Sequence, residues 1–300
     1  MTQKKIEKNS LIVSSTINLL MAGAGIWVFA ATNIHALFLD GVFSLIGCLS
    51  NIFAIILATV SKKRTKTYPD GMYFVEPLYA ILKSLLTLML MAVSIIGTAG
   101  VAYGYFVSGI GEVMNVEPVM PYTALMVVLC FWLSFYNKYQ NKKIGNISTI
   151  LTAESKSNFV DGVLSLGVGI AIVFLKFIDI DGNLSFLHYT GDFFVTTILC
   201  LISLKTPIIV IINSFKELSG GITDDADIKN NVKEVMSTYF DEITAEVKYK
   251  VYKVGMHVKI RISLTYEINK DSLEKLIYAR NSIIKELKTS YDSVEVLFVF

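Results

Sequence analysis

The chain has 300 residues, of which 53% are hydrophobic and only 17% are charged. Its mean hydropathy is +0.57, whereas a typical soluble domain has about 25% charged residues. This composition excludes a disordered chain and indicates an integral membrane protein, and a net charge of +2 does not indicate a nucleic-acid partner. The three cysteines lie far apart and form no CxxC pair, so we expect neither a disulfide framework nor a thiolate metal site.

Six stretches are long and apolar enough to cross a bilayer, which takes about 20 residues. They are residues 11–31, 34–61, 73–101, 119–138, 149–178 and 187–214. The first is too long for the apolar part of a signal peptide, so we interpret it as a true span.

Basic residues gather on one side of these predicted spans. They precede the first span, follow the second and follow the fourth: Lys4, Lys5 and Lys8; Lys62, Lys63, Arg64 and Lys66; Lys138, Lys142 and Lys143. Loops rich in Lys and Arg stay in the cytoplasm, so the pattern predicts a cytoplasmic N-terminus. Six spans then return the C-terminus to the cytoplasm as well.

Two matching motifs stand in the second and fifth predicted spans. Residues 39–45 read LDGVFSL and residues 160–166 read VDGVLSL. Each places an aspartate, Asp40 or Asp161, where a charge costs about 2.5–3.5 kcal/mol near the centre of a membrane helix. The two spans run in opposite directions, which is typical of the inverted repeats of transporters, although coincidence between two short strings is the alternative.

Polar and small residues follow one face of each of these two spans. On the second span they are Asp40, Ser44, Gly47, Cys48 and Asn51, and on the fifth they are Glu154, Ser157, Asn158, Asp161 and Ser165. If the stripes face each other, they enclose a polar path with oxygen ligands. Packing and hydrogen bonding between helices is the alternative reading for the serines and asparagines.

The third span carries Glu76 and Lys83 on one face, two turns apart. They are too far apart for a close pair, so either side chain could instead answer a charge on another helix. A structural ion pair and a role in the path are equally open at this point.

After Gly220 the composition becomes that of a soluble domain. Helical spacing over 228–239, alternation over 243–251 and 256–264, a helical stripe over 273–287 and a last strand over 294–298 give the order α-β-β-α-β. We therefore expect an all-α six-helix membrane bundle at 1–220 and a small α+β domain at 221–300. The acidic group Asp224, Asp225 and Asp227 fits a helix N-terminus better than a ligand set.

The chain resembles the cation diffusion facilitator family over nearly its whole length. The resemblance rests on the six spans, the two motifs, the soluble domain, the segment Tyr68-Pro69-Asp70-Gly71 followed by Glu76-Pro77-Leu78, and the segment 153–157 before Asp161. It implies a homodimeric exporter in the cell membrane that exchanges a divalent metal for protons by alternating access. It also implies a ferredoxin-like soluble domain that mediates dimerisation.

The resemblance also implies a ligand set for the membrane site. Asp40 and Asp161 match the family's positions, and Ser44 and Ser157 stand where the family usually has Asp or His. Ser165, Asn158 and Glu76 are further candidates. Carboxylates with hydroxyls suit Mn²⁺, Mg²⁺ or Fe²⁺ better than a tetrahedral Zn²⁺ site, and Zn²⁺, Co²⁺ and Cd²⁺ stay open as cargo. His257 alone does not predict the additional cytoplasmic metal sites that other members have.

Three other readings remain. A protein of the same architecture could be a membrane-anchored metal sensor or scaffold that does not transport, and the two serines favour this. A transporter or channel for another cation would use the same carboxylates. An enzyme is not expected, because the sequence has neither a nucleophile–base set nor a G-x-S-x-G or H-E-x-x-H motif.

Overall fold

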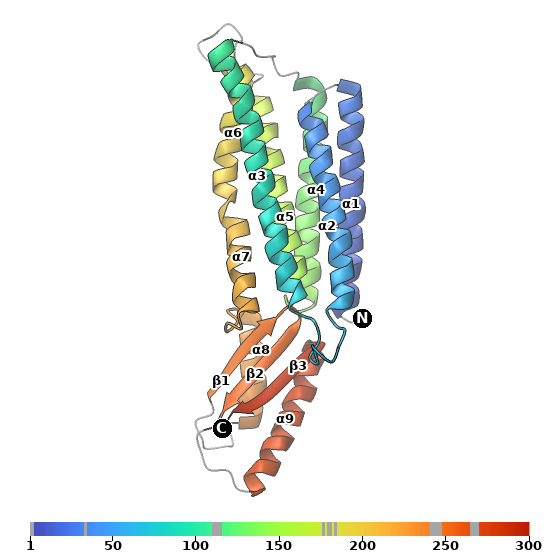
Figure 1. The fold of residues 1–300 in the computed structure, drawn as a ribbon, viewed down its shortest axis with the longest axis vertical. Helices are drawn as coiled ribbons and strands as arrows, with labels where there is room; N and C mark the ends of the chain where they lie inside the picture. The colour runs from blue at the N-terminus through green and yellow to red at the C-terminus, as the bar shows by residue number, and fades with distance from the viewer. Residues whose placement is uncertain are drawn as a thin grey trace.

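A bundle of long helices stands on a small α/β domain (Figure 1). The computed structural model describes residues 3–32, 35–109, 116–175, 178, 182, 185–240, 248–264 and 270–299. The bundle contains α1 (Gln3–Thr32), α2 (His35–Val60), α3 (Val75–Ser108), α4 (Val116–Lys143), α5 (Thr149–Leu175), α6 (Leu187–Ser203) and α7 (Lys205–Leu218). We call the end of the bundle nearest the α/β domain the domain-facing end.

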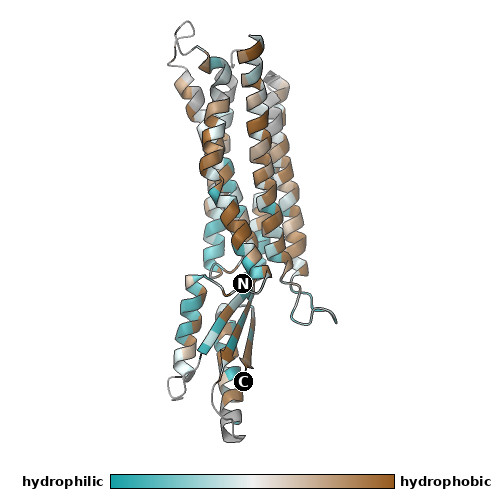
Figure 2. Ribbon diagram, turned by 60° about the vertical axis from the view of Figure 1, so that its left-hand side comes forward, coloured by the Kyte–Doolittle hydropathy of each residue, from teal (hydrophilic) through white to brown (hydrophobic). Residues whose placement is uncertain are grey.

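The bundle has the surface of a membrane protein. Five described stretches are long and apolar enough to cross a bilayer: Gln3–Ala30, Gly41–Val60, Val75–Ser108, Met120–Lys143 and Leu187–Leu218. Large apolar side chains point outward, including Trp27 at 72% and Ile96 at 70% exposure. In Figure 2 the bundle is largely brown away from the α/β domain. Such a surface is stable in lipid, so the chain is an integral membrane protein.

Helix α5 belongs to the same bundle and packs against α3, α4, α6 and α7. It carries Glu154, Lys156 and Asp161, and it runs away from the α/β domain while α2 runs toward it. The opposite directions of the two motif-bearing helices therefore agree with the expected inverted arrangement.

The last predicted span, 187–214, is divided into α6 and α7 at Leu204. Pro207 in the first turn of α7 has no N–H to donate to the carbonyl of Ser203. The next bond along, from the Ile208 N–H to the Leu204 carbonyl, is long at 3.5 Å. A missing and a weakened bond explain why one rod contains two helices.

The first helix begins at Gln3 rather than at residue 11, because its charged first turns have partners inside the protein. Lys4, Glu7 and Ser10 are all buried, and each bonds to a side chain on another element: Lys4 to Glu76, Glu7 to Ser148 and Ser10 to Asn137. A hydropathy reading excludes such residues, whereas pairing allows them to enter the bundle.

The α/β domain follows α7. It comprises α8 (Ala226–Phe240), β1 (Lys248–Val254), β2 (His257–Ser263), α9 (Lys270–Ser290) and β3 (Ser293–Val299), which confirms the predicted order for the described residues. The sheet order is β1-β2-β3, with β1 and β2 antiparallel and β2 and β3 parallel. Residues 241–247, where the first strand was expected to begin, lie outside the described residues.

One face of this sheet forms the core of the domain. Alternate strand residues Val258, Ile260 and Ile262 are fully buried and pack in one cluster with Ile228 of α8 and Ile283 of α9. The alternating apolar residues of the strands thus lie on one face of the sheet, and this face packs against the two helices. Asp225 accepts bonds from the backbone N–H groups of Asp227 and Ile228, so the acidic group caps α8 as expected.

Candidate functional site

The polar stripe of α5 turns toward the interior of the bundle. Ser157 is buried, and its Oγ lies 3.0 Å from Oγ1 of Thr87 on α3. Asp161 and Ser165 follow along the same face and are half-buried. The structure thus brings three predicted site residues of α5 into one line, with Ser157 against α3.

Asn158 is the most enclosed of the predicted ligands on α5. Its side chain is 3% exposed, and its Nδ2 has no hydrogen-bond partner among the described residues. A buried amide without a partner costs about 1–3 kcal/mol. The unpaired atom is an N–H₂ donor one turn from Asp161, so it can donate to water or another acceptor in the bundle but cannot itself ligate a cation.

Glu154 begins the stripe and has the most partners. Its buried carboxylate lies 3.4 Å from Nζ of Lys83 and accepts a hydrogen bond from the hydroxyl of Tyr79, both on α3. With the Asn51 amide oriented to satisfy its neighbours, Asn51 donates to Glu154 Oε1 (3.1 Å) and Oε2 (2.5 Å) and accepts from Asn18 Nδ2 (2.9 Å). Side chains of three helices therefore meet at this carboxylate, and α1 is linked to it through Asn51.

The stripe of α2 divides between two neighbours. Cys48 lies 3.3 Å from the Ser15 hydroxyl, and a Cβ on Gly47 would meet Asn18, so this part faces α1. The Asn51 contact with Glu154 joins the two stripes. Ser44 is half-buried, and Asp40 lies in α2 with a side chain outside the described set.

Counting along the helices from the Asn51–Glu154 contact gives the level of each candidate. Ser44 and Asp161 are each seven residues away from it, toward the end remote from the α/β domain. At 1.5 Å per residue both stand about 10 Å beyond the contact, and Asp40 stands about 16 Å beyond it. Ser44 and Asp161 therefore share a level, and Asp40 is one turn further out.

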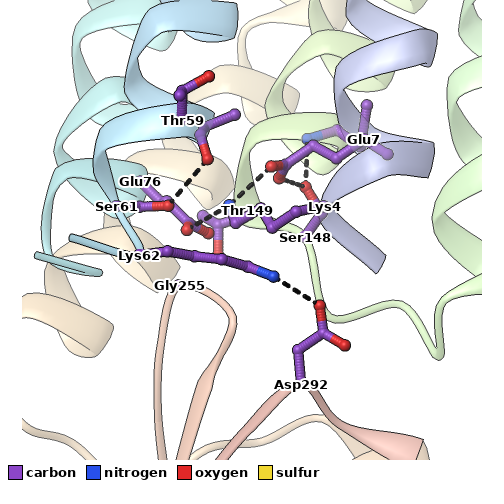
Figure 3. Close-up of polar contacts among 12 residues, drawn as sticks. Lys4, Glu7, Thr59, Ser61, Lys62, Glu76, Ser148, Thr149, Gly255 and Asp292 are labelled. Carbon is purple, nitrogen blue, oxygen red and sulfur yellow. Dashed lines mark hydrogen bonds and ion pairs between the residues drawn. The ribbon is translucent and has the colours of Figure 1, made fainter. Parts of the chain in front are cut away.

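Glu76 lies elsewhere, at the junction between the bundle and the α/β domain (Figure 3). Its Oε1 is 2.5 Å from Nζ of Lys4, which also lies 2.6 Å from Glu7 Oε2. Ser148 donates to the other oxygen of Glu7 at 2.6 Å. Glu76 therefore pairs with Lys4 of α1, and Lys83 pairs with Glu154 of α5. The two residues do not pair with each other.

The junction continues onto the β1–β2 turn and onto Asp292, the residue before β3. Lys253 lies 2.9 Å from Glu217 Oε1, and the Gly255 N–H donates to Glu217 Oε2. Lys62 reaches Asp292 at 2.9 Å, which Figure 3 shows beside Gly255. The α/β domain is therefore fixed to the bundle by both buried and exposed ion pairs.

Burial also shifts the pKa of two groups in the α/β domain. It lowers the pKa of His257, while the nearby Glu295 carboxylate acts in the opposite direction. It raises the pKa of Tyr291 to about 12. Outside the domain core, a hydrogen bond from Lys216 lowers the pKa of Asp224.

Sequence reasoning missed the partners of the predicted residues. Tyr79 was not singled out, although its spacing of four from Lys83 places both on one face of α3, and that spacing was a usable signal. Lys4 and Asn18 gave no comparable signal, because a single polar residue in or before the first predicted span does not reveal its partner. Within the described residues, no three His, Cys, Asp or Glu side chains gather closely enough to hold a metal ion.

Long apolar helices, buried charges among them and an appended α/β domain define a polytopic membrane protein with a polar interior. The family model for the cation efflux transmembrane domain matches residues 11–219. The chain belongs to this family, whose members are metal cation transporters, and the resemblance found in the sequence is confirmed. Comparison with curated proteins gives no match.

Proposed function

We propose that the chain is a divalent metal cation exporter that exchanges its cargo for protons by alternating access. The observation that carries the proposal is the line of oxygen-bearing side chains on α5 within a cation efflux domain. Asp161 stands one turn from Asn158, whose buried side chain carries an amide oxygen. Ionisable residues inside membrane bundles commonly mark ion paths, so this line supports a path through the bundle.

The proposed ligands are the two aspartates with the neighbouring hydroxyl and amide groups. Asp161 and Ser44 share a level, Asp40 lies one turn further out, and Ser157, Asn158 and Ser165 line the same face of α5 as Asp161. Oxygen donors of this kind suit hard cations, which favours Mn²⁺, Mg²⁺ or Fe²⁺ over Zn²⁺, Co²⁺ or Cd²⁺. Glu76 is the least suited candidate, because Lys4 already pairs with it.

Competition between protons and the cation supplies the coupling in this proposal. Asp40 and Asp161 bind the cation when they are ionised and release it when protons neutralise them. The proton and the cation therefore replace each other at the same carboxylates, because a carboxylate must lose its proton before it binds a metal ion. Opening of the bundle at one end at a time converts this exchange into export.

The proposed architecture has six spans, with α5 as the fifth and the α6–α7 rod as the sixth. Residues 1–220 form the transport domain, and residues 221–300 form a ferredoxin-like domain that joins two copies into a homodimer. The basic loops support cytoplasmic termini, since they lie at the domain-facing end.

The test is metal-dependent proton flux in liposomes that contain the purified full chain. Zn²⁺, Mn²⁺, Fe²⁺, Co²⁺, Cd²⁺ and Mg²⁺ are screened in turn, with Asp161→Asn and Asp40→Asn as test variants. Asp224→Asn is the matched control, because this carboxylate is 74% exposed and lies outside the bundle. We expect saturable flux for one or two ions, retained in the control and lost in both test variants.

Three other results would each replace the proposal. Flux that survives in both aspartate variants would assign transport to other residues. The absence of flux for every ion, from folded protein inserted in the membrane, would favour the sensor or scaffold function. Flux that does not depend on the proton gradient would indicate a channel or another cation transporter.

A further inference from the structure

We infer that Glu154 and its partners form the gate that closes the path at the domain-facing end. In this inference Lys83, Tyr79 and Asn51 hold α5 against α3 and α2 while the site at Asp161 is open to the other side. The inference rests on the proposed function, because a gate presupposes a path.

The position of Glu154 supports a gate. It lies on the same face of α5 as Asp161 and about 10 Å closer to the domain-facing end. An ion that moves along the α5 stripe between Asp161 and that end must pass this carboxylate. The Lys83 ammonium, 6% exposed, and the fully buried Glu154 fill that position with a tethered cation and its counter-ion.

The contacts of Glu154 join the elements that alternating access must separate. Tyr79 and Lys83 belong to α3, Asn51 belongs to α2, and Asn51 in turn contacts Asn18 of α1. Helix α5 cannot move away from α2 or α3 at this level without breaking a bond to one carboxylate. One group thus controls whether the domain-facing end is closed.

The chemistry of the contacts favours a reversible closure over a permanent one. Burying an ion pair carries a large desolvation cost, and apolar packing often stabilises a fold equally well. A polar lock has a different advantage, because water or a passing cation can replace each of its bonds when the helices separate. Lys83 neutralises Glu154 while the path is closed, so the carboxylate does not retain the cargo there.

The next turn of α3 offers a position for a reporter beyond the proposed gate. Thr87 lies four residues past Lys83, is 4% exposed and contacts Ser157. The labelling experiment uses the full chain with Cys48, Cys130 and Cys200 replaced by alanine, so that the added Thr87→Cys is the single reactive thiol. A membrane-impermeant cationic thiol reagent is applied to each side of liposomes, whose protein orientation is determined by protease access to the α/β domain.

Three variants weaken the gate in this background. Glu154→Gln removes the charge, Lys83→Met removes the tethered cation, and Tyr79→Phe removes one hydroxyl while keeping the ring. Lys83→Arg keeps a cation and serves as the conservative variant. Ser134→Ala is the matched control, because Ser134 exchanges buried hydrogen bonds with Ser155 between α4 and α5 but does not contact Glu154.

We expect the modification rate from the domain-facing side to rise about tenfold or more in Glu154→Gln and Lys83→Met, given what hydrogen bonds to charged groups contribute. A smaller rise is expected in Tyr79→Phe, and little change in Lys83→Arg and Ser134→Ala. The rate from the opposite side should stay the same or fall. If a charge variant does not fold, Tyr79→Phe carries the test.

Unchanged rates in every folded gate variant would overturn the inference, and so would equal increases from both sides, which would indicate general loosening. Labelling needs no transport, so the result is independent of the flux assay. A one-sided rise in a chain without flux would support the gate and reject the proposed exporter. Flux with no one-sided rise would do the reverse.

Discussion

Gly255 in the β1–β2 turn lies directly against the Glu76 carboxylate of α3. Its φ is +56°, and a Cβ built on it would lie 2.7 Å from both Glu76 Oε2 and the Tyr73 carbonyl oxygen. The position therefore requires glycine twice, for its left-handed backbone and for the lack of space. Through this contact the tip of a hairpin in the α/β domain packs beneath the bundle.

Gly255→Ala should therefore destabilise the full chain more than a left-handed backbone alone explains. The backbone cost of a non-glycine residue is about 1–2 kcal/mol, and the contact with Glu76 and Tyr73 adds to it. Gly220→Ala separates the two effects, because Gly220 has φ +73° with nothing near its Cβ position. Thermal unfolding in detergent should show the larger fall for Gly255→Ala, and equal falls would refute the close contact.

The two ion pairs of the junction should differ in their effect on stability. Lys253 is 8% exposed and also bonds to Thr149, so Lys253→Met leaves a partly buried Glu217 carboxylate without its cation. Removing one partner of a fully buried pair costs about 3–5 kcal/mol, and 16% exposure of Glu217 reduces that figure.

Lys62→Met is the comparison, because its pair with Asp292 is more exposed and such pairs contribute about 0–1 kcal/mol. We expect the melting temperature of the full chain to fall clearly for Lys253→Met and little for Lys62→Met. High salt should reduce only the Lys62 effect. The opposite ranking would show that the exposed pair, and not the buried one, fixes the domain.

The buried His257 side chain should make the protein less stable in mild acid. Burial lowers its pKa from the ordinary value of 6.5, and Glu295, Asp70 and Lys259 are the charged groups that act on it. Below about pH 6.5 the unfolded chain binds a proton that the folded chain does not, so the free energy of unfolding decreases as the pH falls toward the folded pKa. Above that window this contribution is constant.

The measurement compares the wild-type chain with His257→Gln in detergent, at about pH 7.5 and about pH 5.5, on either side of the unfolded pKa. The wild type should lose more thermal stability between these two values than the variant does. Equal losses would mean that the buried ring does not control this transition. In the wild type, Ser293 Oγ lies 2.8 Å from His257 Nδ1 and holds the ring in place. In the variant, the Ser293 hydroxyl can rotate to bond to the glutamine side chain.

Periodicity was sufficient to predict most of the fold. Apolar length found the helices of the bundle, and alternation found β2 and β3, because burial on one face imposes the same period on sequence and structure. It failed at the start of α1 and at Leu204. In the first case Lys4 and Glu7 are buried by partners distant in sequence, and in the second a single proline interrupts an apolar run.

The candidate site was predicted as positions, not as contacts. The α5 stripe lies inside the bundle, whereas Gly47 and Cys48 of the α2 stripe face α1 and Asn51 meets α5. A stripe shows which residues share a face and does not show which helix that face meets. For the same reason the partners of Glu154 on α3 became visible only in three dimensions.

Asn158 allows stability and transport to be separated at one residue. Because its buried Nδ2 has no partner among the described residues, Asn158→Leu should leave thermal stability unchanged or raise it by about 1 kcal/mol. The same change removes an oxygen beside Asp161, so the metal concentration for half-maximal flux should rise. Asn137→Leu is the matched control, because Asn137 is fully buried and bonds to Ser10 and Ser14, so it should lower stability. Normal flux with lowered stability in Asn158→Leu would make Asn158 a packing residue and remove it from the proposed ligand set.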